Sequence, residues 1–295
     1  MKTCLITGTT NGIGLATARS LAEAGLNVVM ATRNLPQASL VGDRLKKTTG
    51  NNNVSIISCD LSSLDSVWLC AQTFLETHDR LDLLINNAGM MTGNRELSTE
   101  GIELTFATNY LGPYLLTRLL MGTLKQSNDG RIVNVTSNIH KMVRNLPLED
   151  LTGGNRYGGM LAYARSKLAN VMSTFSLASL LAGTSVTANC LHPGIVASNL
   201  LPENTPLLRF AGKLVRRVMW NAERGSQTSI HLALSEELKG VSGKYFGANT
   251  REAVPSALAR DHKAQQELWR FSERLLSNHS GFAWETDLYR TETSR

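Results

Sequence analysis

The chain has 295 residues, of which 42% are hydrophobic and 18% charged, and this is enough apolar sequence to bury one large core. Its 24 glycines and 7 prolines are ordinary numbers, which excludes a collagen-like, low-complexity or disordered chain. The net charge of +6 is compatible with nucleic-acid binding, but no aromatic residues interleave the basic ones, so we expect no nucleic-acid partner.

The sequence contains no pattern typical of a targeting signal, a disulfide framework or a metal site. No apolar run reaches the roughly 18 residues that a membrane span needs, and Met1 leads into Thr3 without the apolar segment of a signal peptide. The four cysteines stand far apart and form no C-x-x-C pair, a pattern that indicates neither a metal site nor a disulfide framework. We therefore expect a cytoplasmic protein without a transmembrane segment or a bound metal.

Strand-like and helix-like segments follow one another along the chain. The apolar segments predicted to be strands are 4–7, 26–31, 54–59, 83–86, 131–136 and 243–246. The segments with helical spacing are 13–24, 103–124, 160–181, 255–276 and one beginning near Ala222. Near-continuous apolar strands separated by helices predict a doubly wound α/β fold with a parallel sheet. Because no repeat or linker interrupts the pattern, residues 1–295 are expected to form a single domain.

A glycine-rich turn lies between the first strand and the first helix. It reads Thr7-Gly8-Thr9-Thr10-Asn11-Gly12-Ile13-Gly14, and its glycines are spaced G-x-x-x-G-x-G. Glycine permits positive φ and lets the backbone approach a pyrophosphate bound at a helix N-terminus. Because the turn follows a strand and opens a helix, it favours a dinucleotide site over a plain tight loop.

Arg33, at the end of the second strand, indicates which dinucleotide binds. A site that selects the unphosphorylated cofactor has an acidic residue about 20 positions after the glycines, whereas this chain has Ala31-Thr32-Arg33-Asn34. The arginine favours NADP(H) over NAD(H) through charge-assisted bonds to the 2′-phosphate, the alternative being a solvated strand end. Asp60 is expected to accept from the adenine amino group, to cap the helix beginning near Ser62, or to do both.

Tyr163 and Lys167 lie four residues apart on a predicted helix, so their side chains share one face. A nearby ammonium favours the phenolate and lowers the pKa of a tyrosine, which makes the phenol a usable acid or base. Ser137 and the segment Asn86-Asn87-Ala88-Gly89 end two further strands at the same carboxyl edge. This combination predicts hydride-transfer chemistry on a carbonyl group, with Ser137 hydrogen-bonded to the carbonyl oxygen.

These motifs, in this order and spacing, resemble the short-chain dehydrogenase/reductase family over residues 2–280. The resemblance implies a Rossmann fold with a seven-stranded parallel sheet. It implies that Ser137 polarises the substrate oxygen, Tyr163 is the general acid/base, and Lys167 binds the nicotinamide ribose and lowers the tyrosine pKa. Asn109 matches the family asparagine that holds a water in the proton relay. The residues expected to bind the cofactor are Gly8, Thr10, Asn11, Gly12, Ile13, Gly14, Arg33, Asp60, Leu61, Asn87, Ala88, Gly89, Tyr163, Lys167, Pro193, Gly194 and Val196.

Three segments, 161–170, 191–194 and 243–246, look like the retinol dehydrogenase branch of that family. The branch includes the WW-domain oxidoreductases and is similar to protochlorophyllide reductases. It implies NADP(H)-dependent interconversion of a lipophilic aldehyde or ketone and its alcohol. Two alternatives stay open: a reductase of another apolar ring, such as a steroid, a quinone or a protochlorophyllide-like pigment, and a non-catalytic NADP(H)-sensing protein.

The segment 195–225 is expected to form a lid over the substrate. Within it, residues 207–220 combine apolar and basic side chains at helical spacing, which predicts an amphipathic helix. Three interpretations stay open: a lid with solvated arginines, peripheral membrane contact, or contact with an acidic substrate or partner. The resemblance also implies a homodimer through the helices 103–124 and 160–181.

Overall fold

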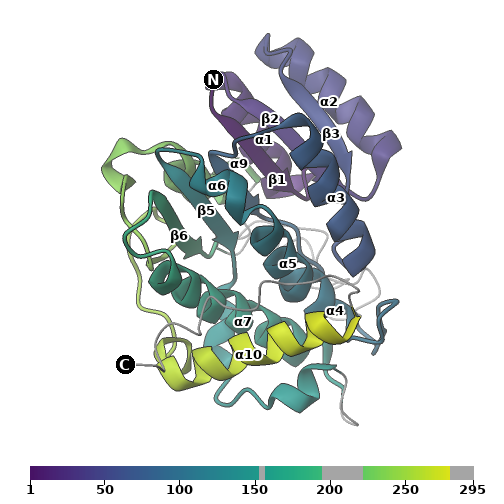
Figure 1. Ribbon diagram of the computed structural model, residues 1–295, viewed down its shortest axis with the longest axis vertical. Helices are drawn as coiled ribbons and strands as arrows, with labels where there is room; N and C mark the ends of the chain where they lie inside the picture. The colour runs from purple at the N-terminus through teal and green to yellow at the C-terminus, as the bar shows by residue number, and fades with distance from the viewer. Residues whose placement is uncertain (153–156, 195–221, 280–295) are drawn as a thin grey trace, which may run out of the picture.

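Seven parallel strands form the central sheet of the computed structural model, in the order β3-β2-β1-β4-β5-β6-β7 (Figure 1). The strands are β1 (Thr3–Thr7), β2 (Asn27–Thr32), β3 (Val54–Ser58), β4 (Leu83–Asn86), β5 (Gly130–Val135), β6 (Val186–Leu191) and β7 (Tyr245–Phe246). The structure describes residues 1–152, 157–194 and 222–279. The strand order reverses between β1 and β4, so the predicted doubly wound fold is confirmed.

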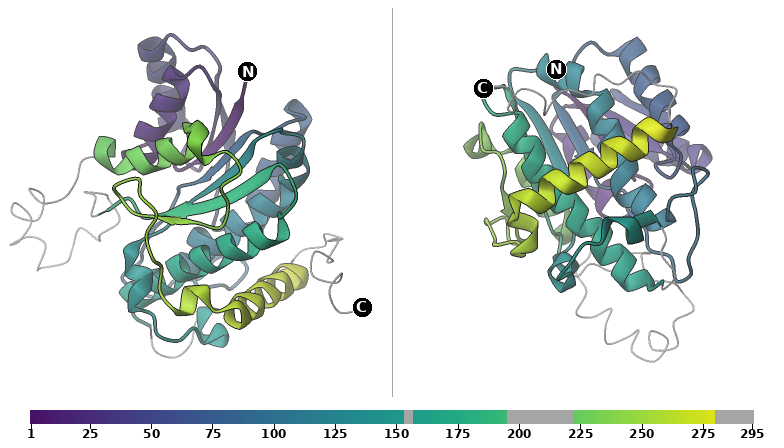
Figure 2. Two further views of the ribbon diagram at one scale, coloured as in Figure 1. Left: turned by 90° about the vertical axis from the view of Figure 1, so that its left-hand side faces the viewer. Right: turned by 60° about the horizontal axis from the view of Figure 1, so that its bottom comes forward.

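Helices cover both faces of the sheet (Figure 2). They are α1 (Gly12–Glu23), α2 (Leu35–Thr49), α3 (Leu64–Thr77), α4 (Leu104–Phe106), α5 (Gly112–Leu119), α6 (Met121–Lys125), α7 (Gly159–Leu180), α9 (Ala222–Leu234) and α10 (His262–His279). Successive side chains of β1 enter different cores, because a strand alternates its faces. Ile6 packs with α1, α2 and α9, whereas Leu5 packs with α3, α5 and α7.

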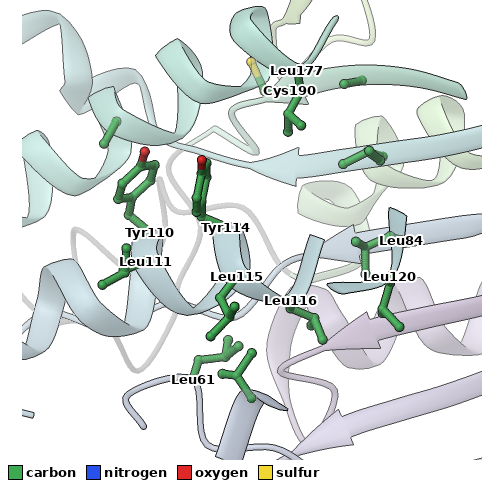
Figure 3. Packing of buried hydrophobic residues seen from close by; sticks show 14 of the residues in the cluster. Leu61, Leu84, Tyr110, Leu111, Tyr114, Leu115, Leu116, Leu120, Leu177 and Cys190 are labelled. Atoms are coloured by element: carbon green, nitrogen blue, oxygen red, sulfur yellow. The ribbon is translucent and has the colours of Figure 1, made fainter. Parts of the chain in front are cut away.

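The larger core lies on the face covered by α3, α5 and α7. Figure 3 shows its side chains, with Leu115 of α5 pointing toward Leu61 beyond β3. The C-terminal helix α10 packs on α7 and reaches the turn before α5, where Tyr110 and Ser272 share a 2.7 Å hydrogen bond. Arg118 of α5 forms an ion pair with Glu273 of α10. The α5–α7 face is therefore covered by this chain's own last helix.

Two elements were missing from the predicted set. The helix α2 begins directly after the residues that looked like a turn, with Asn34 as its N-cap and Pro36 in its first turn. The strand β6 carries Thr187 and Asn189, whose side chains bond to the carbonyls of Gly130 and Val241. All six residues of β6 are buried. The strand was not predicted because its polar side chains, which are buried and hydrogen-bonded, interrupt the apolar pattern.

The single helix predicted for 103–124 is wrong. The segment consists of α4, a π-helical turn at Ala107–Leu111, then α5 and α6. Pro113 stands near the start of α5, and a proline has no N–H to donate four residues back along a helix. A regular α-helix through this segment would therefore lack a hydrogen bond at Asn109.

The last predicted helix, 255–276, also differs from the structure. A short 3-10 turn at Leu258–Arg260 precedes α10, which begins at His262 and ends at His279. Asp261 separates the two, and its carboxylate accepts from the backbone amides of Lys263 and Ala264. This is the side-chain cap that fixes where an α-helix starts.

Candidate active site

The carboxyl ends of β1 and β4 meet where the strand order reverses, which is where sheets of this type bind ligands. The Asn87 side-chain amide donates to the backbone oxygens of Thr7 at 2.9 Å and Gly8 at 3.1 Å. The Thr7 hydroxyl accepts from the amides of Asn87 and Ala88, each at 3.0 Å. The glycine turn and the turn after β4 are therefore locked together.

Glycine is required at two positions of the turn. A Cβ on Gly14 would lie 2.1 Å from the Gly8 oxygen and 2.4 Å from the Asn87 side-chain nitrogen. Gly8 has a φ of +71°, and a Cβ there would lie 2.9 Å from Ala88 Cα. Gly12 has a φ of +56° with open space beside it. The backbone is thus exposed to a ligand at Gly12 and closely packed at Gly8 and Gly14.

The N-terminus of α1 fits the pyrophosphate of a dinucleotide. Its N-cap, Asn11, makes no side-chain cap, and the first turn carries no acidic residue. The first amides of the helix are therefore available to an anion. Within the described residues, the hydroxyl of Thr9 is fully buried and has no hydrogen-bond partner. Thr10 and Ile13, which the sequence predicts to bind the cofactor, stand just before and within the first turn of α1.

Arg33 and Asp60 follow β2 and β3, which lie on the side of β1 away from β4. The Arg33 side chain is 74% exposed, and its Nη1 lies 4.0 Å from Asp60 Oδ2. The other carboxylate oxygen of Asp60 accepts from the Ser62 amide at 2.9 Å. The N-cap of α3 is Ser63, so Asp60 holds the turn before the helix rather than capping it. Leu61 is buried, and its carbonyl is so close to Gly112 that a Cβ there would be excluded.

Tyr163, Lys167 and Ser137 come together at the carboxyl end of β5. Lys167 lies one turn beyond Tyr163 on α7, and its Nζ lies 5.7 Å from the centroid of the Tyr163 ring. Nζ donates to the Val135 carbonyl at 3.0 Å. The Ser137 hydroxyl and the Tyr163 phenol share a hydrogen bond. These side chains therefore form one cluster between α7 and the end of β5.

The pKa values of the cluster differ from the expectation. Burial raises the pKa of Tyr163 to about 12, and the hydrogen bond with Ser137 acts in the opposite direction. Burial lowers the pKa of Lys167 to about 8. Lys167 Nζ lies over the ring and donates to the Val135 carbonyl instead of the phenol oxygen, so burial and the Ser137 hydrogen bond are the causes that act on the Tyr163 pKa.

Asn109 lies in the π-helical turn and joins the turn after β4 to α7. Its Oδ1 accepts from the Met90 amide at 2.7 Å, and its Nδ2 donates to the Met90 carbonyl at 2.8 Å. Nδ2 also donates to Ser166 Oγ at 3.0 Å. A Cβ on Gly89 would lie 3.2 Å from Lys167 Nζ and 3.5 Å from Asn109 Oδ1. The structure thus brings Gly89, Asn109 and Lys167 together.

His140 is a site neighbour that the sequence did not assign. It is fully buried, and its Nδ1 lies 2.7 Å from the Ser137 carbonyl oxygen, while its Nε2 accepts from the Ser256 amide at 3.2 Å. Burial lowers its pKa, so the ring is neutral and donates through Nδ1. The Ser-x-x-His spacing 137–140, in a one-turn helix after a strand, was the available signal.

The remaining predicted residues follow β6. Pro193 and Gly194 end the described segment, and the Gly194 amide donates to His192 Nδ1 at 3.3 Å. Val196 and the part of the expected lid at 195–221 lie outside the described residues. Across the ranges that the structure covers, every helix is too short or too polar to cross a bilayer.

Large exposed apolar side chains belong to the segments around this cluster. Met142 lies in the one-turn helix that follows Ser137, and Met160 and Leu161 lie on the first turn of α7. Val254 precedes the segment bonded to His140. All four stand close in sequence to Ser137, Tyr163 or the segment bonded to His140, and we refer to these four residues as the apolar rim.

The sequence of this chain is similar to those of known dehydrogenases. A family described as short chain dehydrogenase matches residues 2–206. Human retinol dehydrogenase 12 is 39% identical over 284 residues, covering 96% of this chain and 88% of that protein. Human polyprenol dehydrogenase is 38% identical over 275 residues, covering 91% of this chain and 83% of that protein.

Solved structures give the same result for the fold. A protein of Mycobacterium paratuberculosis that carries no assigned activity superposes with a TM-score of 0.77 and 30% identity, covering 94% of both chains. The RhlG/NADP active-site complex of Pseudomonas aeruginosa superposes with a TM-score of 0.67 and 24% identity, covering 88% of this chain and 96% of that one.

Proposed function

The chain belongs to the short chain dehydrogenase family, whose model it matches over residues 2–206, and from this premise we propose that it interconverts a lipophilic aldehyde or ketone and its alcohol with NADP(H). Membership makes it an oxidoreductase of a family that uses NAD(H) or NADP(H). The observation that carries the proposal is the cluster of Ser137, Tyr163 and Lys167, which lies at the same carboxyl edge of the sheet as the glycine-rich turn.

The cofactor would be held along the carboxyl edge of the sheet. The turn 8–14 and the first amides of α1 would bind its pyrophosphate, with Asn87, Ala88 and Gly89 beside them. Lys167, Pro193, Gly194 and Val196 would line its nicotinamide end. When bound, the nicotinamide ring supplies or accepts the hydride at the substrate carbon.

Proton transfer is assigned to Tyr163. Because the phenol has a pKa of about 12, it is protonated at neutral pH and can donate a proton from Oη to the developing alkoxide. The Ser137 hydroxyl, already bonded to that phenol, would hold the substrate oxygen next to it. Lys167, with a pKa of about 8, can return a proton toward Tyr163, and Asn109 lies beside it. This arrangement favours carbonyl reduction.

The preference for NADP(H) rests on Arg33. The end of β2 carries no carboxylate to accept from ribose hydroxyls, and the exposed guanidinium is free to turn toward a 2′-phosphate. Its pairing with Asp60 is long and solvent-exposed, and such pairs contribute little. Asp60 would then be available to the adenine amino group.

A lipophilic substrate is supported by two independent observations. The exposed residues of the apolar rim stand in segments that adjoin the cluster along the chain, and exposed apolar side chains that gather in one place commonly mark ligand or partner surfaces. Relatives named for retinol and polyprenol oxidation align over more than nine-tenths of the chain. We therefore infer an elongated apolar aldehyde or ketone, with a steroid, quinone or protochlorophyllide-like ring as the alternative class.

The partners we propose are a second copy of the chain and a membrane surface. A homodimer through the segments 103–124 and 160–181 would have to include α10, which packs on α7 and forms an ion pair with α5. Peripheral membrane contact is proposed for 207–220, which the structure does not describe. We propose that residues 1–295 form a single domain with the lid at 195–225.

The test is NADPH consumption, followed by its near-ultraviolet absorbance, across a panel that contains retinal, aliphatic aldehydes, steroid ketones and quinones. We expect oxidation of NADPH with apolar aldehydes, and slower turnover when NADH replaces it. Tight NADPH binding without turnover of any carbonyl, in darkness or light, would contradict the enzymatic proposal and favour an NADP(H)-sensing protein.

A further inference from the structure

The π-helical turn at Ala107–Leu111 contains one backbone carbonyl that cannot accept an α-helical hydrogen bond. The residue four positions after Asn109 is Pro113, which has no N–H. An α-helical bond to the Asn109 oxygen is therefore impossible in this sequence. A buried carbonyl that lacks a donor is costly, and Asn109 is only 1% exposed.

Asn170 supplies a side-chain donor to this carbonyl. Its Nδ2 donates to the Asn109 backbone oxygen at 2.9 Å, across 61 residues of sequence. Tyr163, Lys167 and Asn170 stand at positions i, i+4 and i+7 of α7 and so share one helix face. The helix that carries the proposed catalytic pair therefore also holds the π-helical turn in place.

Asn170 is itself held from the sheet side. Its backbone carbonyl accepts from the hydroxyls of Ser173 at 3.2 Å and Thr174 at 2.7 Å. Thr174 Oγ1 accepts from Asn134 of β5 at 2.8 Å, and Asn134 Oδ1 accepts from Asn86 of β4 at 2.8 Å. A continuous buried chain of hydrogen bonds thus links two central strands to the turn.

The position of Asn109 matters because of what its side chain connects. That amide holds both polar groups of Met90 and bonds Ser166, whose hydroxyl donates to the Tyr163 carbonyl at 2.8 Å. A shift of the Asn109 backbone would move the turn after β4 and the first turns of α7 relative to each other. Both segments border Lys167.

We propose that Asn170 is a positioning residue, which by holding the Asn109 carbonyl sets the Asn109 amide beside Lys167 and keeps Tyr163 and Lys167 in register for proton transfer. This inference rests on the proposed function. It predicts an effect on the rate of the chemical step, because misplacement of about 1 Å in a reacting group is enough to slow an enzyme about 100-fold.

The test compares Asn170→Ala and Asn170→Asp with the control Ser176→Ala. Asn170→Asp keeps the side-chain volume but removes the donor, and Ser176→Ala removes a buried hydroxyl on the same helix that has no hydrogen-bond partner within the described residues. With NADPH and the best carbonyl of the panel, we expect kcat to fall about 10- to 100-fold in both Asn170 variants. We expect KM to stay near the wild-type value, and Ser176→Ala to behave as wild type.

A second measurement is independent of turnover. Amide hydrogen exchange at Met90, whose N–H donates to Asn109 Oδ1, should quicken in both Asn170 variants and not in Ser176→Ala. Wild-type kcat in Asn170→Asp, or unchanged Met90 protection in both Asn170 variants, would overturn the proposal. If the wild-type protein reduces no carbonyl, the proposed function fails, and the Met90 exchange alone decides the role of Asn170.

Discussion

The two ends of the proposed cofactor crevice are built in different ways. At the nicotinamide end, Lys167 and Asn109 are buried, and each is held by hydrogen bonds of 3.0 Å or less. At the adenosine end, Arg33 is 74% exposed and meets Asp60 across 4.0 Å of solvent-accessible space. The buried end holds its groups in fixed positions, whereas the exposed end leaves a long cationic side chain free to move.

Because of this difference, we expect the buried end to control the rate of the reaction and the exposed end to control the choice of cofactor. Groups that act on the reacting atoms must be positioned before the substrate arrives, and this is the role we propose for the polar network from Asn86 to Asn109. A charge that only distinguishes two cofactors can stay in water, where its effect is modest and screened by salt. Substitutions at the buried end should therefore change kcat, and substitutions at the exposed end should change relative cofactor affinity.

The largest effect is expected for Tyr163→Phe. Removing the phenol oxygen removes the proton donor, and kcat should fall about 10²- to 10⁴-fold, the usual contribution of a general acid. NADPH binding, measured by calorimetry, should be retained. The control Tyr157→Phe removes a phenol bonded to Thr92 and Glu103 and should keep wild-type turnover. Appreciable turnover by Tyr163→Phe would remove Tyr163 from its assigned role.

A smaller effect is expected on the pH dependence of stability, through the ionisation of Lys167. The pKa of Lys167 is about 8 in the folded protein, and it is 10.5 for a lysine that is not buried. Between these two pH values the unfolded chain binds one more proton than the folded protein, so the free energy of unfolding rises with pH. Between pH ~7.5 and ~9.5 this one group should add about 2 kcal/mol to the free energy of unfolding.

Urea unfolding of wild type and Lys167→Met at both pH values checks the sign, because the contributions of other groups cancel in the comparison. The wild-type protein should gain stability relative to the variant as pH rises. Parallel pH dependence in the two proteins would mean that the Lys167 amine titrates normally, in conflict with its burial.

The smallest effect is expected for Arg33→Asp. The loss of one or two charge-assisted bonds should weaken NADPH binding about tenfold or more, with NADH affinity nearly unchanged. Binding titrations at low and high salt measure this, and the preference should shrink as salt rises. Arg44→Asp, which makes the same charge change on the exposed side of α2, is the control. Equal weakening of both cofactors by Arg33→Asp would contradict the 2′-phosphate assignment.

Much of the fold was predictable because most strands bury both faces and so read as continuous apolar runs. Where that rule was broken the prediction was incomplete. In β6, Thr187 and Asn189 are buried but bonded to backbone carbonyls, and polar residues paired in this way look like a loop in sequence. Before α2, Asn34 and Pro36 read as a turn, although the same pair is a helix N-cap followed by proline in the first turn.

The site was predictable at the level of motifs and not at the level of contacts. The Tyr-x-x-x-Lys spacing identifies two side chains on one helix face, but no local pattern indicates that Lys167 lies over the ring and donates to Val135. Asn170 is 61 residues from the carbonyl that it holds. Pro113 was the available clue, because it removes the helical donor to Asn109, but it does not say which side chain replaces it.

The most direct test of the account is the fate of the hydride. The protein would be incubated with NADPH deuterated at the reactive nicotinamide carbon and with retinal or the best carbonyl of the panel, and the product analysed by mass spectrometry. The account predicts an alcohol with deuterium on the carbinol carbon from the wild-type protein, and almost none from Tyr163→Phe. An unlabelled alcohol, or no alcohol from any carbonyl tested, would contradict it.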